Sequence, residues 1–156
     1  MSDGNQINWV MEFFKIIPTL IVAAIAAYIA YQQWITARAK LNLDLFNRRF
    51  AVFMTTWETA SRVLQSDKPL YSPPSFTNLY PEASFLFKPD VETFMKELAD
   101  KMNNLAIIRE LIVRNSDIVP PDKISDLSEL QEWISNAAVE GIRGKFSPYL
   151  DFSKWR

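Results

Sequence analysis

The hydrophobic positions of the chain fall into two patterns, and the first is a long apolar stretch. Between Ile16 and Tyr31 no residue is charged and almost all are apolar. At a rise of about 1.5 Å per residue, the stretch from Ile16 to Trp34 covers roughly 28 Å as a helix, close to the thickness of a bilayer core. The pattern predicts a transmembrane helix over residues 13–35, after a short tail over residues 1–12.

A cleaved signal peptide or the core helix of a soluble protein would also contain an apolar stretch. A signal peptide begins with a basic region, whereas the tail contains Asp3 and Glu12 and no Lys or Arg. A core helix that is hydrophobic on every face is untypical of a chain of 156 residues. Trp9 before the stretch, and Tyr31 with Trp34 at its end, are typical of bilayer interfaces. We therefore favour the transmembrane helix.

Charged residues beside the apolar stretch indicate its orientation. Arg38, Lys40, Arg48 and Arg49 follow it, whereas only Lys15 lies on the other side. The positive-inside rule therefore predicts that the C-terminal part lies in the cytoplasm and that the tail lies outside. The absence of cysteine is consistent with a cytoplasmic domain that needs no disulfide.

Small residues form two ridges inside the apolar stretch. Ala23 and Ala27 are four positions apart, as are Ala26 and Ala30. Such small-xxx-small pairs let helices approach closely in lipid. Alanine is also simply a good helix former, which would account for the same pattern without any contact between helices. The functional hypothesis is self-association of the transmembrane helices, and hence a homo-oligomer.

The second pattern begins beyond residue 36 and is amphipathic. Apolar residues recur there at alternating spacings of three and four, which is a heptad seam. The seam consists of Leu43, Phe46, Phe50, Phe53, Trp57, Ala60 and Leu64. Neighbouring apolar residues widen this face, so we expect the helix to pack within its own domain and to leave a strip for a neighbouring subunit. No helix breaker lies between Thr19 and Ser66, so the two patterns form one rod or two rods that meet near residues 32 and 33.

The following segment predicts a loop and then a helix. Residues 67–89 contain five prolines together with many aromatic residues, which indicates an ordered loop rather than a disordered linker. A helix is expected from Pro89, with Asp90 and Glu92 in its first turn, to about residue 115. Its apolar stripe at helical spacing consists of Val91, Met95, Leu98, Met102, Leu105 and Ile112.

A third helix is expected near the C-terminus. Asp126 followed by Glu129 resembles a capping box, so Asp126 is the expected N-cap. Gly141 and Gly144 are expected to end this helix, and the aromatic residues of the last segment, 145–155, are expected to pack back on the bundle. The fold class predicted for the whole chain is therefore all-α, with a three-to-four-helix domain over residues 36–156.

Composition excludes several classes of function. The chain contains no His and no Cys, which removes most zinc sites, thiol nucleophiles and histidine-based catalysis. Its three glycines form neither a Walker loop nor a GxGxxG turn. A formal net charge of −1 provides no basic field for DNA. We therefore expect a protein that is not an enzyme, has no metal or cofactor, and does not bind DNA.

Cations near aromatic residues are the candidates for a ligand site. A cyclic nucleotide needs Arg or Lys for its phosphates and an aromatic ring or polar group for its bases. The candidates are Lys88, Arg109, Arg114, Lys145, Tyr80, Phe87 and Tyr149. Each has a structural alternative, as a surface charge or a core ring. For Arg109 we favour an arginine at the rim of an apolar stripe, paired with a carboxylate.

Three motifs carry a resemblance to a known group of proteins. They are LNLDLFNRRF (residues 41–50), which follows a Tyr-Gln-Gln-Trp membrane exit, FLFKPDV (85–91) and KFSPYLDFSK (145–154). They resemble a widespread family of small bacterial single-pass membrane proteins, and the resemblance covers most of the chain. It implies a bacterial inner-membrane location and assigns no catalytic residue. The layout is also similar to that of membrane effectors of type III CRISPR and related anti-phage systems, which bind a cyclic oligoadenylate.

Two functional hypotheses follow. In the first, the chain is an oligomeric membrane effector whose cytoplasmic domain binds a nucleotide second messenger and perturbs the bilayer in anti-phage defence. In the alternative, it is a tethered helical interaction module, or a small subunit of a larger inner-membrane complex, without ligand or catalysis. A hydrolase that uses carboxylates alone is disfavoured by the missing histidines.

Overall fold

The structure is a computed structural model, which describes residues 4–115 and 121–151. The described part is all-α, as the sequence predicts, and contains no strand. The helices are α1 (Gly4–Gln65), α2 (Pro74–Thr77), α3 (Tyr80–Leu86), α4 (Pro89–Arg114), η1 (Pro121–Lys123), α5 (Ile124–Asn136), the π-helical turn η2 (Ala137–Gly141) and α6 (Ile142–Leu150). The chain divides into two compact units, residues 1–43 and 44–156.

The first unit consists of the N-terminal part of α1. This helix is long and apolar enough to cross a membrane, and no part of its apolar window is buried. Every described side chain from Ile16 to Leu41 is exposed, including the alanine ridges. This exposure is the opposite of what a core helix of a soluble protein would show.

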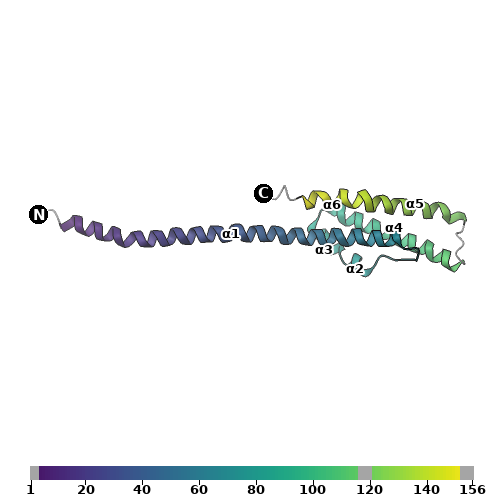
Figure 1. Ribbon diagram of the computed structural model, residues 1–156, viewed down its shortest axis with the longest axis horizontal. Coiled ribbons are helices and arrows are strands. Elements are labelled where there is room, and N and C mark those ends of the chain that lie inside the picture. Colours follow the sequence, from purple (N-terminus) through teal and green to yellow (C-terminus); the bar gives the residue numbers. More distant parts are fainter. Residues whose placement is uncertain (1–3, 116–120, 152–156) are drawn as a thin grey trace. The chain divides into compact units, whose positions relative to one another are not determined.

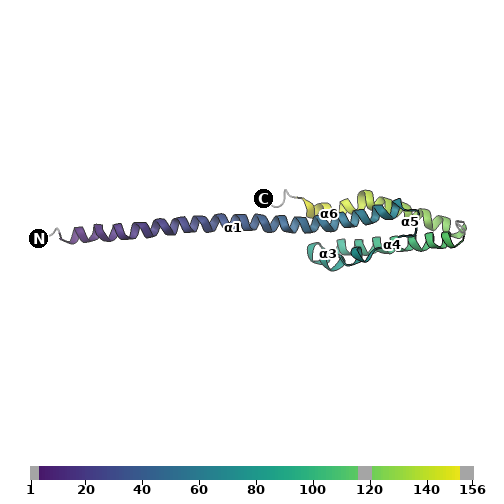
Figure 2. The same ribbon diagram turned by 60° about the horizontal axis from the view of Figure 1, so that its bottom comes forward.

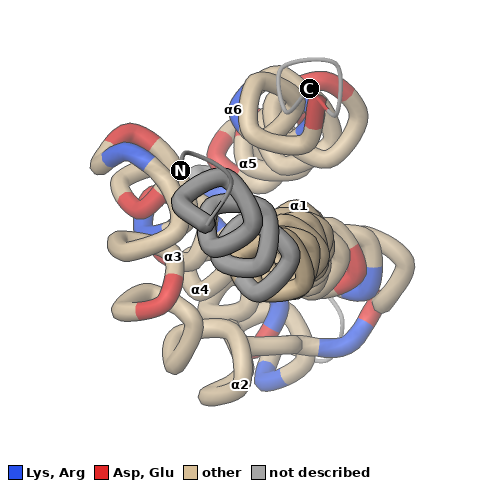
Figure 3. The backbone as a smooth tube through the Cα atoms, turned by 90° about the vertical axis from the view of Figure 1, so that its left-hand side faces the viewer, with Lys and Arg blue, Asp and Glu red and all other residues tan. Residues whose placement is uncertain are grey.

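The second unit is a helical bundle. Figures 1 and 2 show α4 and the run formed by α5, η2 and α6 lying beside the C-terminal part of α1, residues 44–65. Lys and Arg positions are interspersed with Asp and Glu positions over the bundle rather than gathered by sign (Figure 3).

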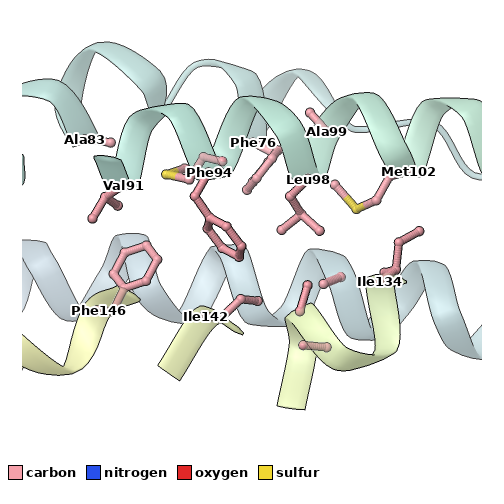
Figure 4. Packing of buried hydrophobic residues seen from close by; sticks show 14 of the residues in the cluster. Phe76, Ala83, Val91, Phe94, Leu98, Ala99, Met102, Ile134, Ile142 and Phe146 are labelled. Atoms are coloured by element: carbon pink, nitrogen blue, oxygen red, sulfur yellow. The ribbon is translucent and has the colours of Figure 1, made fainter. Parts of the chain in front are cut away.

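The core of the bundle is built chiefly on α4, where the expected stripe is confirmed. Val91, Met95, Leu98, Met102 and Leu105 are all completely buried. Figure 4 shows side chains of α4 pointing toward Ile134, Ile142 and Phe146 on the α5–α6 run. Pro89 at the first helical position and acidic residues in the first turn explain the start of α4 at the expected residue.

The buried face of α1 differs from the expected seam. The side chains buried here are Val52, Thr56, Thr59, Ala60 and Val63, whereas Phe50 and Trp57 are exposed. The threonines can be buried because their hydroxyls donate to carbonyl oxygens one turn earlier, from Thr56 to Val52 at 2.8 Å and from Thr59 to Thr55 at 2.7 Å. Of the expected seam, Ala60 is buried, and Phe53 and Leu64 are partly buried against the core. The apolar periodicity therefore identified part of the buried face and missed the two threonines.

The proline-rich segment is more regular than expected. It contains the two short helices α2 and α3, which bury Phe76 and Ala83 completely. Pro74 and Pro81 lie in the first turns of these helices, where a missing backbone N–H costs no hydrogen bond. Prolines there begin short helices instead of preventing them.

The C-terminal helical run corrects two expectations. Helix α5 begins at Ile124 with Lys123 at the N-cap position, so Asp126 is not the N-cap. Asp126 instead accepts a 3.0 Å hydrogen bond from Nζ of Lys123. Gly141 and Gly144 do not end the helix, which continues through η2 and α6 to Leu150. Gly141 has ordinary right-handed helical angles, so nothing in its backbone terminates the run.

The aromatic C-terminal segment packs back on the bundle as expected within its described part. Phe146 is completely buried, and Tyr149 and Leu150 are half-buried against the core. Phe152 and Trp155 lie outside the described residues.

Candidate ligand groove

The described part of the bundle contains an open groove of about 790 Å³ between the start of α4 and the α5–α6 run. Its lining residues are Lys88, Asp90 and Phe94 from the α4 side, and Trp133, Asn136, Ala137, Glu140, Gly141, Gly144, Lys145, Pro148 and Tyr149 from the other side. The second group recurs at spacings of three and four, so it forms one face of the continuous helical run. Volumes of this size are typical of small-molecule and cofactor sites.

The π-helical turn η2 forms the middle of the groove. The N–H of Ile142 donates to the carbonyl of Ala137, five residues earlier. π-Helical turns are rare and are frequently found at functional sites. Gly141 is the last residue of this turn, and a Cβ atom at this position would lie 3.5 Å from the ring of Phe94. A methyl group at this position would therefore be in ordinary van der Waals contact with Phe94.

Tyr149 joins the two sides of the groove at one end. Its hydroxyl accepts a 3.4 Å hydrogen bond from the backbone N–H of Lys88 and donates at 3.5 Å to Oδ1 of Asp90. These bonds hold the end of α6 against the first turn of α4. The phenol ring is thereby fixed at the mouth of the groove, beside Lys88.

The charges of the groove are mixed. Lys88 and Lys145 are exposed, and so are Asp90 and Glu140. None of these groups forms an ion pair with a described residue. The formal charges of the four side chains cancel. They leave two cations and two anions without an ion-pair partner among the described residues, and Asp90 accepts only the hydrogen bond from Tyr149.

Aromatic rings form the remaining wall. The rings of Phe94 and Trp133 lie with their centroids 6.5 Å apart, and Nζ of Lys101 lies 5.6 Å from the centroid of Trp133. The buried ring of Phe87 packs edge-on against Tyr149 at 5.2 Å, behind the groove rather than in it. The groove thus offers flat apolar surface together with polar groups.

Arg49 of α1 supports Tyr149 from behind, a role that the sequence did not reveal. Its Nε donates to the carbonyl of Leu86 at 3.0 Å, and its Nη1 donates to the carbonyl of Tyr149 at 3.4 Å. The guanidinium carbon also lies 6.0 Å from the centroid of Phe87 and 5.7 Å from that of Tyr149. Burial lowers the pKa of Arg49. In the sequence this residue counted only toward the positive-inside bias.

The predicted site residues separate into two groups. Lys88, Lys145 and Tyr149 line the groove, and Phe87 packs behind it. Arg109, Arg114 and Tyr80 lie elsewhere. Asp90, Trp133, Asn136 and Glu140 line the groove without having been singled out. A regular α-helical projection would place Lys145 well away from the last three, because the π-helical turn between them changes the phase of the run.

The candidates outside the groove have structural contacts. Arg109 is buried and donates to a backbone carbonyl, and burial lowers its pKa. Arg114 forms a 2.5 Å ion pair with Glu110 on the surface of α4. Tyr80 packs edge-on against Phe76 at 5.9 Å, and Nζ of Lys96 lies 5.9 Å from its ring centroid. In the described residues, no group of three or more Asp or Glu side chains is placed to hold a metal.

Comparison with known proteins adds no relative. No protein-family model, curated protein or solved structure matches this chain. The groove and the apolar helix are therefore the observations on which function can be argued.

Proposed function

We propose that this chain is a membrane-anchored effector whose helical unit binds a nucleotide second messenger of the cyclic oligoadenylate class in the groove. The observation that carries the proposal is the convergence of Lys88, Lys145 and Tyr149 on one groove of suitable volume. Ammonium groups pair with phosphates, and aromatic rings stack on bases. Trp133 supplies a second ring on the same wall.

In this proposal α1 anchors the chain in a bacterial inner membrane, with the helical unit in the cytoplasm. The ridges formed by Ala23, Ala26, Ala27 and Ala30 support self-association in the bilayer. Ligand binding rearranges the transmembrane helices and perturbs the membrane, as in the anti-phage effectors whose layout the chain resembles. The chain itself carries out no catalysis.

A second candidate function is a tethered protein-interaction module. The observation that favours it is the presence of Asp90 and Glu140 in the same groove as the two lysines. A protein segment that carries both signs of charge would pair with all four groups, whereas a polyanion would pair only with the lysines. This candidate requires an oligomer or a partner protein, and no nucleotide.

Thermal unfolding of the full-length chain in detergent micelles distinguishes the two candidates. The probes are cyclic di-, tri-, tetra- and hexanucleotides, with helix content followed by circular dichroism. A ligand at 100 times its dissociation constant stabilises a protein by about 2.7 kcal/mol, which raises the unfolding midpoint by several degrees. A shift with one ring size supports the messenger proposal. No shift with any ring size, in a sample that unfolds cooperatively, rejects it and leaves the interaction module.

Variants locate the site. The double variant Lys88→Gln/Lys145→Gln removes both cations from the groove and is expected to abolish the shift. Lys68→Gln is the matched control, because Lys68 is exposed and lies outside the groove. A full shift in the double variant would place nucleotide binding elsewhere.

The proposed orientation has a separate test. Because the chain contains no cysteine, single cysteines can be labelled selectively. In intact cells a membrane-impermeant maleimide is expected to label Ser2→Cys and to spare Arg62→Cys. Labelling of Arg62→Cys alone would indicate the opposite orientation, with the helical unit outside the cytoplasm.

A further inference from the structure

Helix α1 carries a row of side chains on one side that are exposed or only half-buried. Phe50 and Trp57 are 43% and 44% exposed, and Met54 between them is half-buried. Asn47 and Ser61 extend the row at either end. We call these five residues the outer face of α1. It contains no charged residue.

The outer face has the spacing of a two-helix interface. Its positions follow one another at intervals of three, four, three and four residues. In heptad terms Asn47, Met54 and Ser61 occupy a positions, and Phe50 and Trp57 occupy d positions. We infer that this face binds the same face of a second copy of the chain, as a parallel pair of helices in register.

The chemistry of Asn47 favours a second copy over a different partner. A primary amide carries both a donor and an acceptor, so two copies of Asn47 facing each other can satisfy one another. A single asparagine at an a position is a known device for fixing register and a two-stranded state. A two-fold pair would also place each ring of Phe50 and Trp57 opposite its own copy.

The flanking charges permit this pairing. Asp44, Arg48, Glu58 and Arg62 are all exposed beside the outer face, and each acid is followed by a base four residues later. The flank therefore has no net charge, so two identical copies approach without like-charge repulsion. A strongly acidic or basic flank would instead have favoured a partner of the opposite sign.

Anchoring explains the parallel direction. Two copies inserted in one membrane with the same orientation enter the aqueous phase with α1 running the same way, and confinement to the bilayer raises their effective concentration. The inference rests on the proposed function for the anchor and gives the proposed self-association a surface. It does not depend on the ligand groove.

Cysteine scanning of the full-length chain in membranes tests the inference, since the chain has no native cysteine. Single cysteines at Asn47, Phe50, Met54 and Trp57 are expected to form disulfide-linked dimers upon mild oxidation. The matched controls are Arg48→Cys, Thr55→Cys and Arg62→Cys, which share heptad position b, outside the a and d positions of the face. Crosslinking at least several-fold stronger at the face supports the inference. Equal crosslinking at all positions, or none, overturns it.

A second measurement separates the outer face from the transmembrane helix. Sedimentation of the detergent-solubilised chain is expected to show a dimer that becomes a monomer in Phe50→Ser/Trp57→Ser. Helix content and unfolding midpoint check that this variant remains folded. Ala23→Leu/Ala27→Leu disrupts the alanine ridge instead. If only the alanine variant dissociates, the outer face is not the interface.

The two proposals can fail separately. A nucleotide-induced shift of the unfolding midpoint reports on the groove, whereas the crosslinking pattern reports on the outer face. Loss of the dimer in Phe50→Ser/Trp57→Ser with retention of the shift would support both. Absence of crosslinking at the outer face of an otherwise unaltered chain would reject only the interface.

Discussion

Nη1 of Arg109 donates a 2.7 Å hydrogen bond to the backbone carbonyl oxygen of Val63, and so connects the C-terminal part of α4 to the end of α1. The side chain is only 6% exposed. A charged group can be buried there because it satisfies a carbonyl near the helix C-terminus, where the macrodipole favours a cation. Asp67, just beyond this end of α1, opposes the lowering of the arginine pKa by burial.

Arg109→Met is expected to destabilise the bundle by about 1–3 kcal/mol, because the carbonyl of Val63 loses its partner while the apolar stem is kept. Chemical denaturation monitored by circular dichroism measures the change. Arg114→Met is the control, since Arg114 lies on the surface. Equal stability of the two variants would show that the buried hydrogen bond contributes nothing.

Replacing Arg49 tests the support behind Tyr149. Arg49→Lys keeps the charge but loses the planar group that reaches two carbonyls and lies over two rings, so we expect a cost of about 1–3 kcal/mol. The neighbouring Arg48→Lys, at an exposed position, should change the free energy of unfolding by less than about 0.5 kcal/mol. Similar costs at both positions would contradict the bridging role.

Two phenylalanines provide a matched test of the core. Phe146 is completely buried and packs edge-on against the rings of Phe53 and Phe87, whereas Phe85 is 90% exposed. Phe146→Ala is expected to cost about 3–5 kcal/mol, through lost burial and the cavity left behind. Phe85→Ala should change stability by about 0.5 kcal/mol or less. A large effect at Phe85 would indicate that this ring is covered in the folded protein.

The stability of the bundle should depend on acid through Glu110. Its carboxylate accepts a hydrogen bond from the hydroxyl of Tyr71 and pairs with Arg114, and these contacts lower the pKa of Glu110. A lowered pKa in the folded state means that the stabilisation is present above the unfolded pKa of about 4.3 and is lost as pH falls through the folded pKa.

Tyr71→Phe should therefore lower the unfolding midpoint at pH 7, and its difference from the unaltered chain should shrink toward pH 3. The control is Tyr80→Phe, because the pKa of Tyr80 is raised mainly by burial and its hydroxyl does not titrate in that range. A difference that stays constant from pH 7 to pH 3 would separate Tyr71 from the titration of Glu110.

The sequence predicted those elements whose signals are local. The apolar stretch after Lys15, the start of α4 at Pro89 and the buried stripe of α4 depend on periodicity and on the fixed geometry of proline, and all appear in the structure. The start of α5 was misplaced because Asp126, a good capping residue, pairs with Lys123 instead of capping a helix.

The groove was only partly predictable, for a physical reason. Lys88 and Lys145 could be identified as cations near aromatic residues, but their convergence depends on how α4 packs against the α5–α6 run. Because the helix was expected to end at Gly141, the groove-lining face of the α5–α6 run was not recognised as one continuous face. Arg49 was missed because its partners are carbonyl groups far along the chain, which no spacing in the sequence reveals.

The wide turn over Ala137–Gly141 sets the angular phase of everything that follows it. Each residue of an α-helix advances the side chains by about 100°, so a regular α-helix through the same residues would place Lys145 about 120° around the axis from Trp133. The π-helical turn takes up one extra residue, and so brings Lys145 and Tyr149 back to the side of Trp133 and Asn136. One further residue inserted beside Val139, itself exposed, would rotate α6 by roughly 100° relative to α5 and so separate the two halves of the site while every chemical group is kept.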